Sequence, residues 1–247
     1  MFAIYKKELK GYFTNPIGFI YVGVFLVVAA LICAFTTIQK ASYNTSAYFQ
    51  YLIFTFVVLI PLLTMRSFAE ERKTRTEQLL LTAPVTLTGM VLGKFFAALT
   101  LFASSVLVAC INFFPLLSTA ITEASASTAD THIGPIGGQV VGSLLGVLLI
   151  GAAFIAVGIF VSSLTESQLA AAVITMASLF GMVLIGIVSS SVSAAPVRVV
   201  LDWLSILSRF DMFSMGIFDV SALLYYVSIA GVFISLTVRV YEKRRWG

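Results

Sequence analysis

One run in the first half of the chain comes close to a nucleotide-binding phosphate loop: Gly89-Met90-Val91-Leu92-Gly93-Lys94-Phe95. In such a loop, backbone N–H groups cradle phosphates, a lysine reaches the outer phosphates and a hydroxyl holds magnesium. This run has one residue too few between its glycines, and Phe95 stands where the loop has Ser or Thr. It also opens an apolar run instead of joining a strand to a helix. We therefore predict that it binds no nucleotide.

A second run, Glu70-Glu71 followed by Arg75, is similar to the first motif of membrane-embedded proteases of the CAAX-processing type. Those enzymes also need histidines within the membrane to hold a metal or to activate water. This chain has a single histidine, His132, in a stretch that we expect outside the membrane. No histidine-rich zinc site and no Ser–His or Cys–His pair can be assembled. We expect no catalytic residue, metal site or bound cofactor in this chain.

The elements that carry these residues are membrane helices. The 247 residues are 60% hydrophobic and 11% charged, whereas soluble domains carry about 25% charged residues. A helix of about 20 residues crosses the hydrocarbon core of a bilayer. The sequence predicts an all-α integral membrane protein with one domain (residues 1–247) and six spans, at 17–38, 48–65, 95–117, 140–161, 169–188 and 220–238.

The basic residues fix the expected orientation. If the N-terminus is cytoplasmic, only Lys40, Arg198 and Arg209 of the 15 Lys and Arg residues lie outside. The others fall in inside segments: Lys6, Lys7, Lys10, Arg66, Arg72, Lys73, Arg75, Lys94, Arg239, Lys243, Arg244 and Arg245. Such a bias predicts that both termini are cytoplasmic, in a multi-pass protein of the inner membrane. No basic face with interleaved aromatic residues favours nucleic-acid binding.

The N-terminal residues 1–15 are expected to form an interfacial helix. Phe2, Tyr5, Leu9, Tyr12 and Phe13 recur at helical spacing, while Lys7, Glu8 and Lys10 are expected to point away from that stripe. Asn15-Pro16 then ends this helix and starts the first span.

Residues 66–90 form a charged segment between the second and third spans. We predict a cytoplasmic helix from Ser67 that ends at Pro84, with Glu71 and Arg72 exposed. The cluster Leu79, Leu80 and Leu81 could rest on lipid headgroups or fill an apolar groove on a partner protein, and the sequence leaves both open.

The remaining stretches are polar or mixed. Residues 118–138 are expected to form an outer loop, and 162–168 a short cytoplasmic turn. Residues 193–219 are expected to form short helices that are half-buried at the outer interface or re-enter it. Cys33 and Cys110 lie in predicted spans and are expected to be small core residues. No predicted span contains Asp, Glu, Lys or Arg, which argues against an ion-coupled transporter.

The whole chain resembles the permease subunits of ABC-2-type ATP-binding-cassette transporters, and in particular their gliding-motility and multidrug branch. The charged segment carries the most specific match, Met65 to Arg72 and then Thr76 to Val85. Arg75 departs from the family pattern, because relatives often have Gly there. The other matching positions are Lys7-Glu8-Leu9, Tyr12-Phe13, Asn15-Pro16, Gly93-Lys94, Ser162-Ser163, Gln168, Phe213 to Gly216 and Arg245-Trp246.

The resemblance implies a six-span subunit that pairs with a second permease subunit, identical or different, and binds separate ABC ATPase subunits. ATP and magnesium would be held by the ATPase. The charged segment would be the coupling helix, with the contact residues Glu70, Glu71, Arg72, Glu77, Leu79 and Leu80. A second, smaller contact would involve Ser163, Glu166 and Gln168.

The leading hypothesis is therefore a permease, most simply an exporter, embedded in membrane lipid and powered from outside the bilayer. A membrane anchor within a motility or secretion apparatus is compatible with the same resemblance. A membrane-embedded protease is disfavoured by the single histidine.

Overall fold

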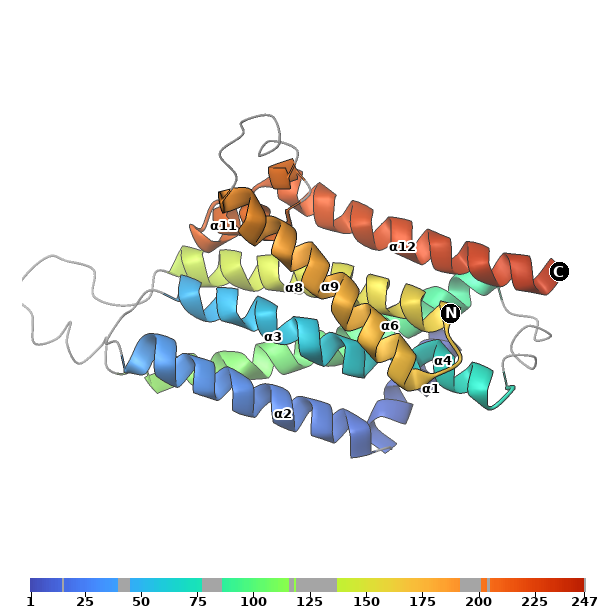
Figure 1. Cartoon of the computed structure of the whole chain (residues 1–247). Coiled ribbons are helices and arrows are strands. Elements are labelled where there is room, and N and C mark those ends of the chain that lie inside the picture. The colour runs from blue at the N-terminus through green and yellow to red at the C-terminus, as the bar shows by residue number, and fades with distance from the viewer. Residues whose placement is uncertain are drawn as a thin grey trace, which may run out of the picture.

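The structure is a computed structural model that describes residues 1–14, 16–39, 45–76, 86–115, 118, 137–191, 201–203 and 205–246. Every regular element in these residues is a helix (Figure 1). The described residues contain six helices that are long and apolar enough to cross a membrane, which confirms the predicted all-α, multi-pass fold.

The six spanning helices agree in order with the predicted ones and are mostly longer. The first is α2 (Pro16–Cys33), which continues as the π-helical turn η1 (Ala34–Ile38). The third is α6 (Leu87–Ala109), which continues as the 3-10 turn η2 (Cys110–Phe113). The others are α3 (Ser46–Thr64), α8 (Gly137–Leu164), α9 (Gln168–Ser191) and α12 (Val220–Trp246).

Helix α8 is the centre of the bundle. It packs against α3, α6, α9 and α12, and against the short helices α4 (Arg66–Lys73) and α11 (Ile206–Ser214). Small residues permit this close packing, as is usual between membrane helices. A Cβ on Gly151 would lie 2.1 Å from Phe102 Cε1, and one on Gly158 would lie 2.2 Å from Thr64 Oγ1.

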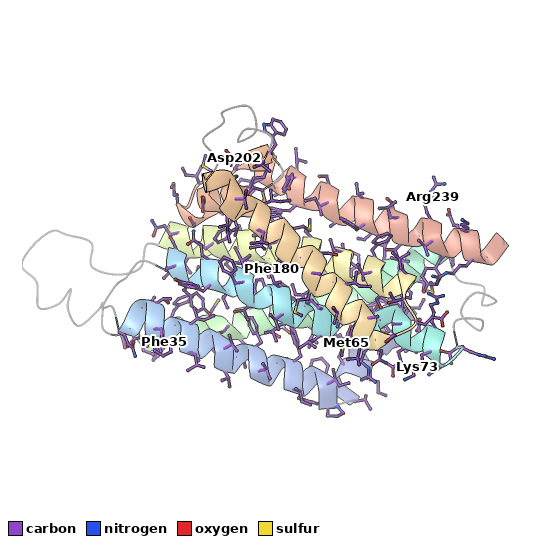
Figure 2. The ribbon with its side chains drawn as sticks, in the orientation of Figure 1. Phe35, Met65, Lys73, Phe180, Asp202 and Arg239 are labelled. Atoms are coloured by element: carbon purple, nitrogen blue, oxygen red, sulfur yellow. The ribbon has the colours of Figure 1, made fainter. Side chains whose placement is uncertain are left out.

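The two ends of the bundle carry different elements. Both chain termini lie at the end where α4 is found, and α11 lies at the opposite end (Figure 1). Lys73 and Arg239 mark the first end, and Phe35 and Asp202 mark the second (Figure 2). Between them, α2, α9 and α12 expose many large apolar side chains, as expected for surfaces that face lipid or another membrane subunit.

The charged segment differs from its prediction. Helix α4 follows α3 with only Met65 between them, and it ends at Lys73. Residues 74–76 form a turn in which Arg75 has φ +57°, so one continuous helix from Ser67 to Pro84 is wrong. Residues 77–85, including Glu77, Leu79 and Leu80, lie outside the described residues.

Helix α6 begins earlier than the predicted span. The Thr86 side chain accepts a hydrogen bond from the Gly89 backbone N–H, as an N-cap does, so the helix starts at Leu87. Lys94 therefore lies two turns inside a spanning helix and is buried. The expectation that no spanning helix carries a charged residue is wrong at this position.

Three further predicted regions are described to different extents. The N-terminal helix is confirmed as α1 (Phe2–Thr14), although its place at the membrane interface stays a prediction. In the region 193–219, α11 buries Ile206, Phe210 and Phe213, and Ser205 caps it by accepting from the Ser208 N–H. The outer loop residues 119–136, including His132, lie outside the described residues.

Candidate functional site

The candidate site is the end of the bundle where α4 meets α1, α6 and α8. The hydroxyl group of Ser162 on α8 makes three hydrogen bonds at the start of α4. Its Oγ accepts hydrogen bonds from the N–H groups of Phe68 and Ala69, both at 3.1 Å, and donates one to Met65 O at 3.1 Å. A serine hydroxyl has one donor and two acceptor positions, so all three are used. Ser162 is buried, which holds α4 at a defined place on α8.

A lysine on α6 connects α4 to the N-terminal helix. Lys94 Nζ donates to Glu8 Oε1 on α1 at 3.1 Å, to Glu71 Oε1 on α4 at 2.8 Å and to Ser67 O on α4 at 2.7 Å. It also lies 4.9 Å from the centre of the Phe68 ring. An ammonium group has three N–H donors, and here each has an acceptor. Only 2% of the Lys94 side chain is exposed, so the two carboxylates compensate a buried charge.

This cluster corrects two expectations. Glu8 was expected to point away from the stripe of aromatic and aliphatic residues on α1, and Glu71 was expected to be exposed. Both carboxylates instead bind Lys94. The physical reason is the buried ammonium group, because a charge taken out of water needs oppositely charged partners. On α1 the packed face consists of Ile4, Glu8 and Tyr12, four residues apart, while Phe2 and Phe13 are exposed.

Arg72 joins the two predicted contact regions to each other. Its guanidinium donates to Glu166 Oε1 in the turn between α8 and α9 at 2.8 Å, and to the carbonyl of Leu164, the last residue of α8, at 3.0 Å. From α12, Arg244 donates to Ser163 O at 2.7 Å. The last carbonyl groups of a helix have no partner within it, and cations are favourable there. The two arginines therefore cap the end of α8.

The predicted residues of the second contact differ in accessibility. Ser163 is buried, and its hydroxyl donates to Phe160 O at 2.6 Å, so its side chain is not available to a partner. Glu166 has 72% of its side chain exposed, although it binds Arg72. Gln168 is half-buried at the start of α9.

A small cavity lies between α1 and the junction of α3 and α4. Its volume is about 100 Å³. Burial raises the pKa of the Tyr12 phenol at its edge, and the nearby Glu8 carboxylate raises it further. Arg66 and Glu70 form an ion pair of 2.8 Å beside it, and Glu70 keeps 41% of its side chain exposed. The lining residues are Glu8, Gly11, Tyr12, Ile17, Leu63, Arg66, Ser67 and Glu70.

The polar contacts of the candidate site connect five helices. Side chains from α1, α4, α6, α8 and α12 meet in one network, and exposed charges of α4 and of the α8–α9 turn remain on its outer side. Sequence reasoning missed the roles of Glu8, Lys94, Ser162 and Arg244. Only the four-residue spacing of Ile4, Glu8 and Tyr12 could have signalled that Glu8 faces inward.

The fold defines a multi-pass α-helical membrane protein with a charged helix at one end of its bundle. The chain belongs to the ABC-2 family transporter proteins, because the model of that family matches residues 34–239. It is therefore a permease subunit of an ABC transporter. The matched region includes α4, Lys94 and the α8–α9 turn, whereas α1 precedes it. No curated protein matches the chain significantly.

Proposed function

We propose that this chain is the permease subunit of an exporter and that a separate ABC ATPase subunit binds the α4 end of its bundle. The observation that carries the proposal is the construction of α4: contacts tie it to α1, α6 and α8, while Lys73 is exposed and Glu70 is partly exposed. A helix built in this way can transmit a push from a soluble partner to the bundle. ATP and magnesium are held by that partner.

The proposed contact comprises Glu70, Arg72, Glu77, Leu79 and Leu80, with Glu166 and Gln168 beside them. Glu71 and Ser163 take part indirectly, because Glu71 binds Lys94 and the Ser163 backbone carbonyl binds Arg244. Burial of one leucine contributes about 1.5–3 kcal/mol. Since about 1.4 kcal/mol corresponds to a tenfold change in affinity, Leu80→Ala should weaken ATPase binding roughly tenfold to a hundredfold.

The test is co-purification of the ATPase with Leu79→Ala, Leu80→Ala and Glu70→Ala variants. Leu31→Ala is the matched control, because Leu31 is an exposed leucine on the spanning helix α2. We expect the two leucine variants to lose most of the ATPase, Glu70→Ala to lose little and the control to lose none. Unchanged binding by both leucine variants would refute this contact. ATPase binding without cargo-stimulated hydrolysis would instead favour an anchoring role.

The orientation that this proposal needs places the α4 end in the cytoplasm, as the distribution of Lys and Arg indicates. Single cysteines at Lys243 and Met215 test it in a chain whose Cys33 and Cys110 are replaced by alanine. Both positions are exposed, at opposite ends of the bundle. In intact cells, an impermeant thiol reagent should label Met215→Cys and leave Lys243→Cys unlabelled. The reverse pattern would invert the topology.

We further propose that the working complex contains two permease subunits, identical or different, and two ATPases. The exposed apolar faces of α2, α9 and α12 offer area for a second permease subunit as well as for lipid. The mass of the detergent-solubilised complex checks this stoichiometry. Uptake of cargo into inverted membrane vesicles, dependent on ATP, would establish export.

A further inference from the structure

The run that comes close to a phosphate loop has a packing role. Gly89 and Gly93 lie on the face of α6 that receives α1. A Cβ on Gly93 would lie 3.1 Å from Ile4 Cγ2 and 3.2 Å from Met1 O, and one on Gly89 would lie 3.7 Å from Met1 Cβ. Glycines four residues apart permit this kind of close backbone approach between membrane helices. Gly89 and Gly93 therefore form the surface of α6 against which α1 packs.

Lys94 directly follows Gly93 and adds a charged contact to this packing. Its ammonium group has one acceptor on α1 and two on α4, so a single side chain of α6 holds both helices. The ammonium group sits over the Phe68 ring, which the buried Tyr241 of α12 contacts from its own helix. Loss of Lys94 would leave two carboxylates without their cation, whereas loss of one carboxylate would leave Lys94 paired with the other.

We propose that Lys94 is a positioning residue that joins α4 to α1 and α6, so that these three helices move as one body when the ATPase acts on α4. The proposal rests on the proposed function for the direction of the force, since it concerns how movement of α4 reaches the bundle. The Lys94 cluster itself is a property of the permease alone.

The first experiment therefore uses the purified permease without an ATPase. Thermal unfolding is measured for Lys94→Met, Glu8→Gln, Glu71→Gln and the double variants that combine Lys94→Met with each carboxylate change. Lys94→Met should lower the Tm by roughly 6–20 °C, because it leaves two half-buried carboxylates without a cation. In the Lys94→Met background, Glu8→Gln and Glu71→Gln should cost little or raise the Tm, because each removes an uncompensated charge.

Lys243→Met is the matched control, because Lys243 is an exposed lysine at the same end of the bundle. It should leave the Tm unchanged. Strictly additive effects of the Lys94 and carboxylate substitutions would overturn the cluster, whatever the ATPase does. A wild-type permease that binds no ATPase would refute the proposed function and leave this result standing.

The second experiment asks whether the helices move together. Glu8→Gln leaves the exposed residues of α4 in place, so the complex should keep ATPase binding and basal hydrolysis and lose cargo stimulation. A variant that merely folded less well would lose all three together. Retention of full cargo stimulation by Glu8→Gln would overturn the positioning role.

A cross-link provides the complementary result. A Cβ at position 93 would lie 3.2 Å from Ile4 Cβ, close to the separation found in disulfides. Ile4→Cys with Gly93→Cys, in a chain with Cys33 and Cys110 replaced by alanine, should therefore form a disulfide between α1 and α6. If the helices move as one body, the oxidised complex should match the cargo-stimulated hydrolysis of its own reduced sample. If cargo stimulation were lost on oxidation and recovered on reduction, α1 would have to separate from α6 during transport.

Discussion

The two short helices, α4 and α11, lie at opposite ends of the bundle, and each is followed by a residue in the left-handed conformation. After α11, Gly216 has φ +79°, its N–H donates to Phe213 O, and the Ile217 N–H donates to Met212 O. That is the Schellman arrangement, in which glycine is favoured because it has no Cβ. After α4, Arg75 has φ +57° and donates its N–H to Arg72 O.

The ends differ in how the chain completes the turn. Beyond Arg75, it is the hydroxyl of Thr76 that reaches Glu71 O, at 3.4 Å, where the α11 turn uses a backbone N–H. At the α11 end the fixation is mainly apolar, through Phe210 and Phe213 against α8, with a hydrogen bond of 2.8 Å from the Tyr226 hydroxyl to Ile206 O. The α4 end is held together by compensated charges, whereas the α11 end is held together mainly by apolar packing.

The two ends of the bundle should therefore respond differently to the loss of a side chain. An apolar contact weakens in proportion to what is removed, whereas a compensated buried charge becomes a penalty when its partner is lost. The α4 end therefore makes its helices depend on one another. Such dependence suits the transmission of force that we propose for the α4 end.

The largest expected effect is the difference between two cations. Lys94→Met should cost about 3–5 kcal/mol, because it breaks a buried ion cluster. Arg209→Met at the α11 end should cost only about 1 kcal/mol. The Arg209 guanidinium stacks 4.5 Å from the Tyr225 ring centre and donates to Ser221 Oγ at 3.1 Å, and within the described part of the chain no carboxylate forms an ion pair with it. Unfolding of both variants in the same detergent measures the difference, and equal losses would remove the distinction between the ends.

Ser162→Ala is expected to have the next largest effect, about 1–3 kcal/mol, because the N–H groups of Phe68 and Ala69 would remain buried without their acceptor. Ser178→Ala on α9 is the matched control, since that hydroxyl donates only to Ile174 O of its own helix. We expect the control to be nearly neutral in thermal unfolding. If both substitutions cost the same, Ser162 does not fix α4 in the way we describe.

Features of this structure that depend on a local stretch of sequence could be predicted, whereas features that depend on residues far apart in the sequence could not. The six spans could be identified because each apolar run is long enough to cross a bilayer on its own. The ends of the spanning helices could not be identified in the same way, because α6 and α12 continue through charged residues. The N-cap at Thr86 lies outside the apolar run of α6. The inward orientation of Glu8 depends on Lys94, far away in the sequence, and no local pattern identifies that partner.

The site was predictable to a similar degree. The charge of residues 66–90 located the α4 end, and the short polar turn after α8 located Glu166. What the sequence did not separate is which charges are compensated internally and which remain accessible. Glu70 and Glu71 are neighbours in sequence, yet Glu70 pairs with Arg66 and stays partly exposed while Glu71 binds Lys94, because adjacent helical residues point in different directions.

The third prediction concerns the glycine of the α11 turn. Gly216→Ala should cost about 1–2 kcal/mol, because an L-residue is disfavoured in the left-handed region. A Cβ there would also lie 3.1 Å from the Gly138 carbonyl carbon, which is backbone and cannot rotate away. Gly23→Ala in α2 is the control, since a Cβ at Gly23 meets nothing within 4 Å. A Gly216→Ala protein as stable as the control would show that this turn tolerates a side chain.

The smallest expected effect is the reciprocal change at the α4 end. Arg75→Gly should raise the free energy of unfolding by up to about 1 kcal/mol, because glycine adopts φ +57° without the steric cost of a Cβ. The gain is limited, since glycine also loses more conformational freedom on folding. Arg75→Ala separates backbone from side chain: it keeps the Cβ and removes the guanidinium, so its stability should match that of the wild type. If Arg75→Ala were as stabilising as Arg75→Gly, charge repulsion rather than backbone conformation would be the cause. If both variants also lost ATPase binding, Arg75 would belong to the contact with the partner. The unfavourable left-handed conformation of Arg75 would then be retained because binding needs an arginine at the position where the α11 turn has glycine.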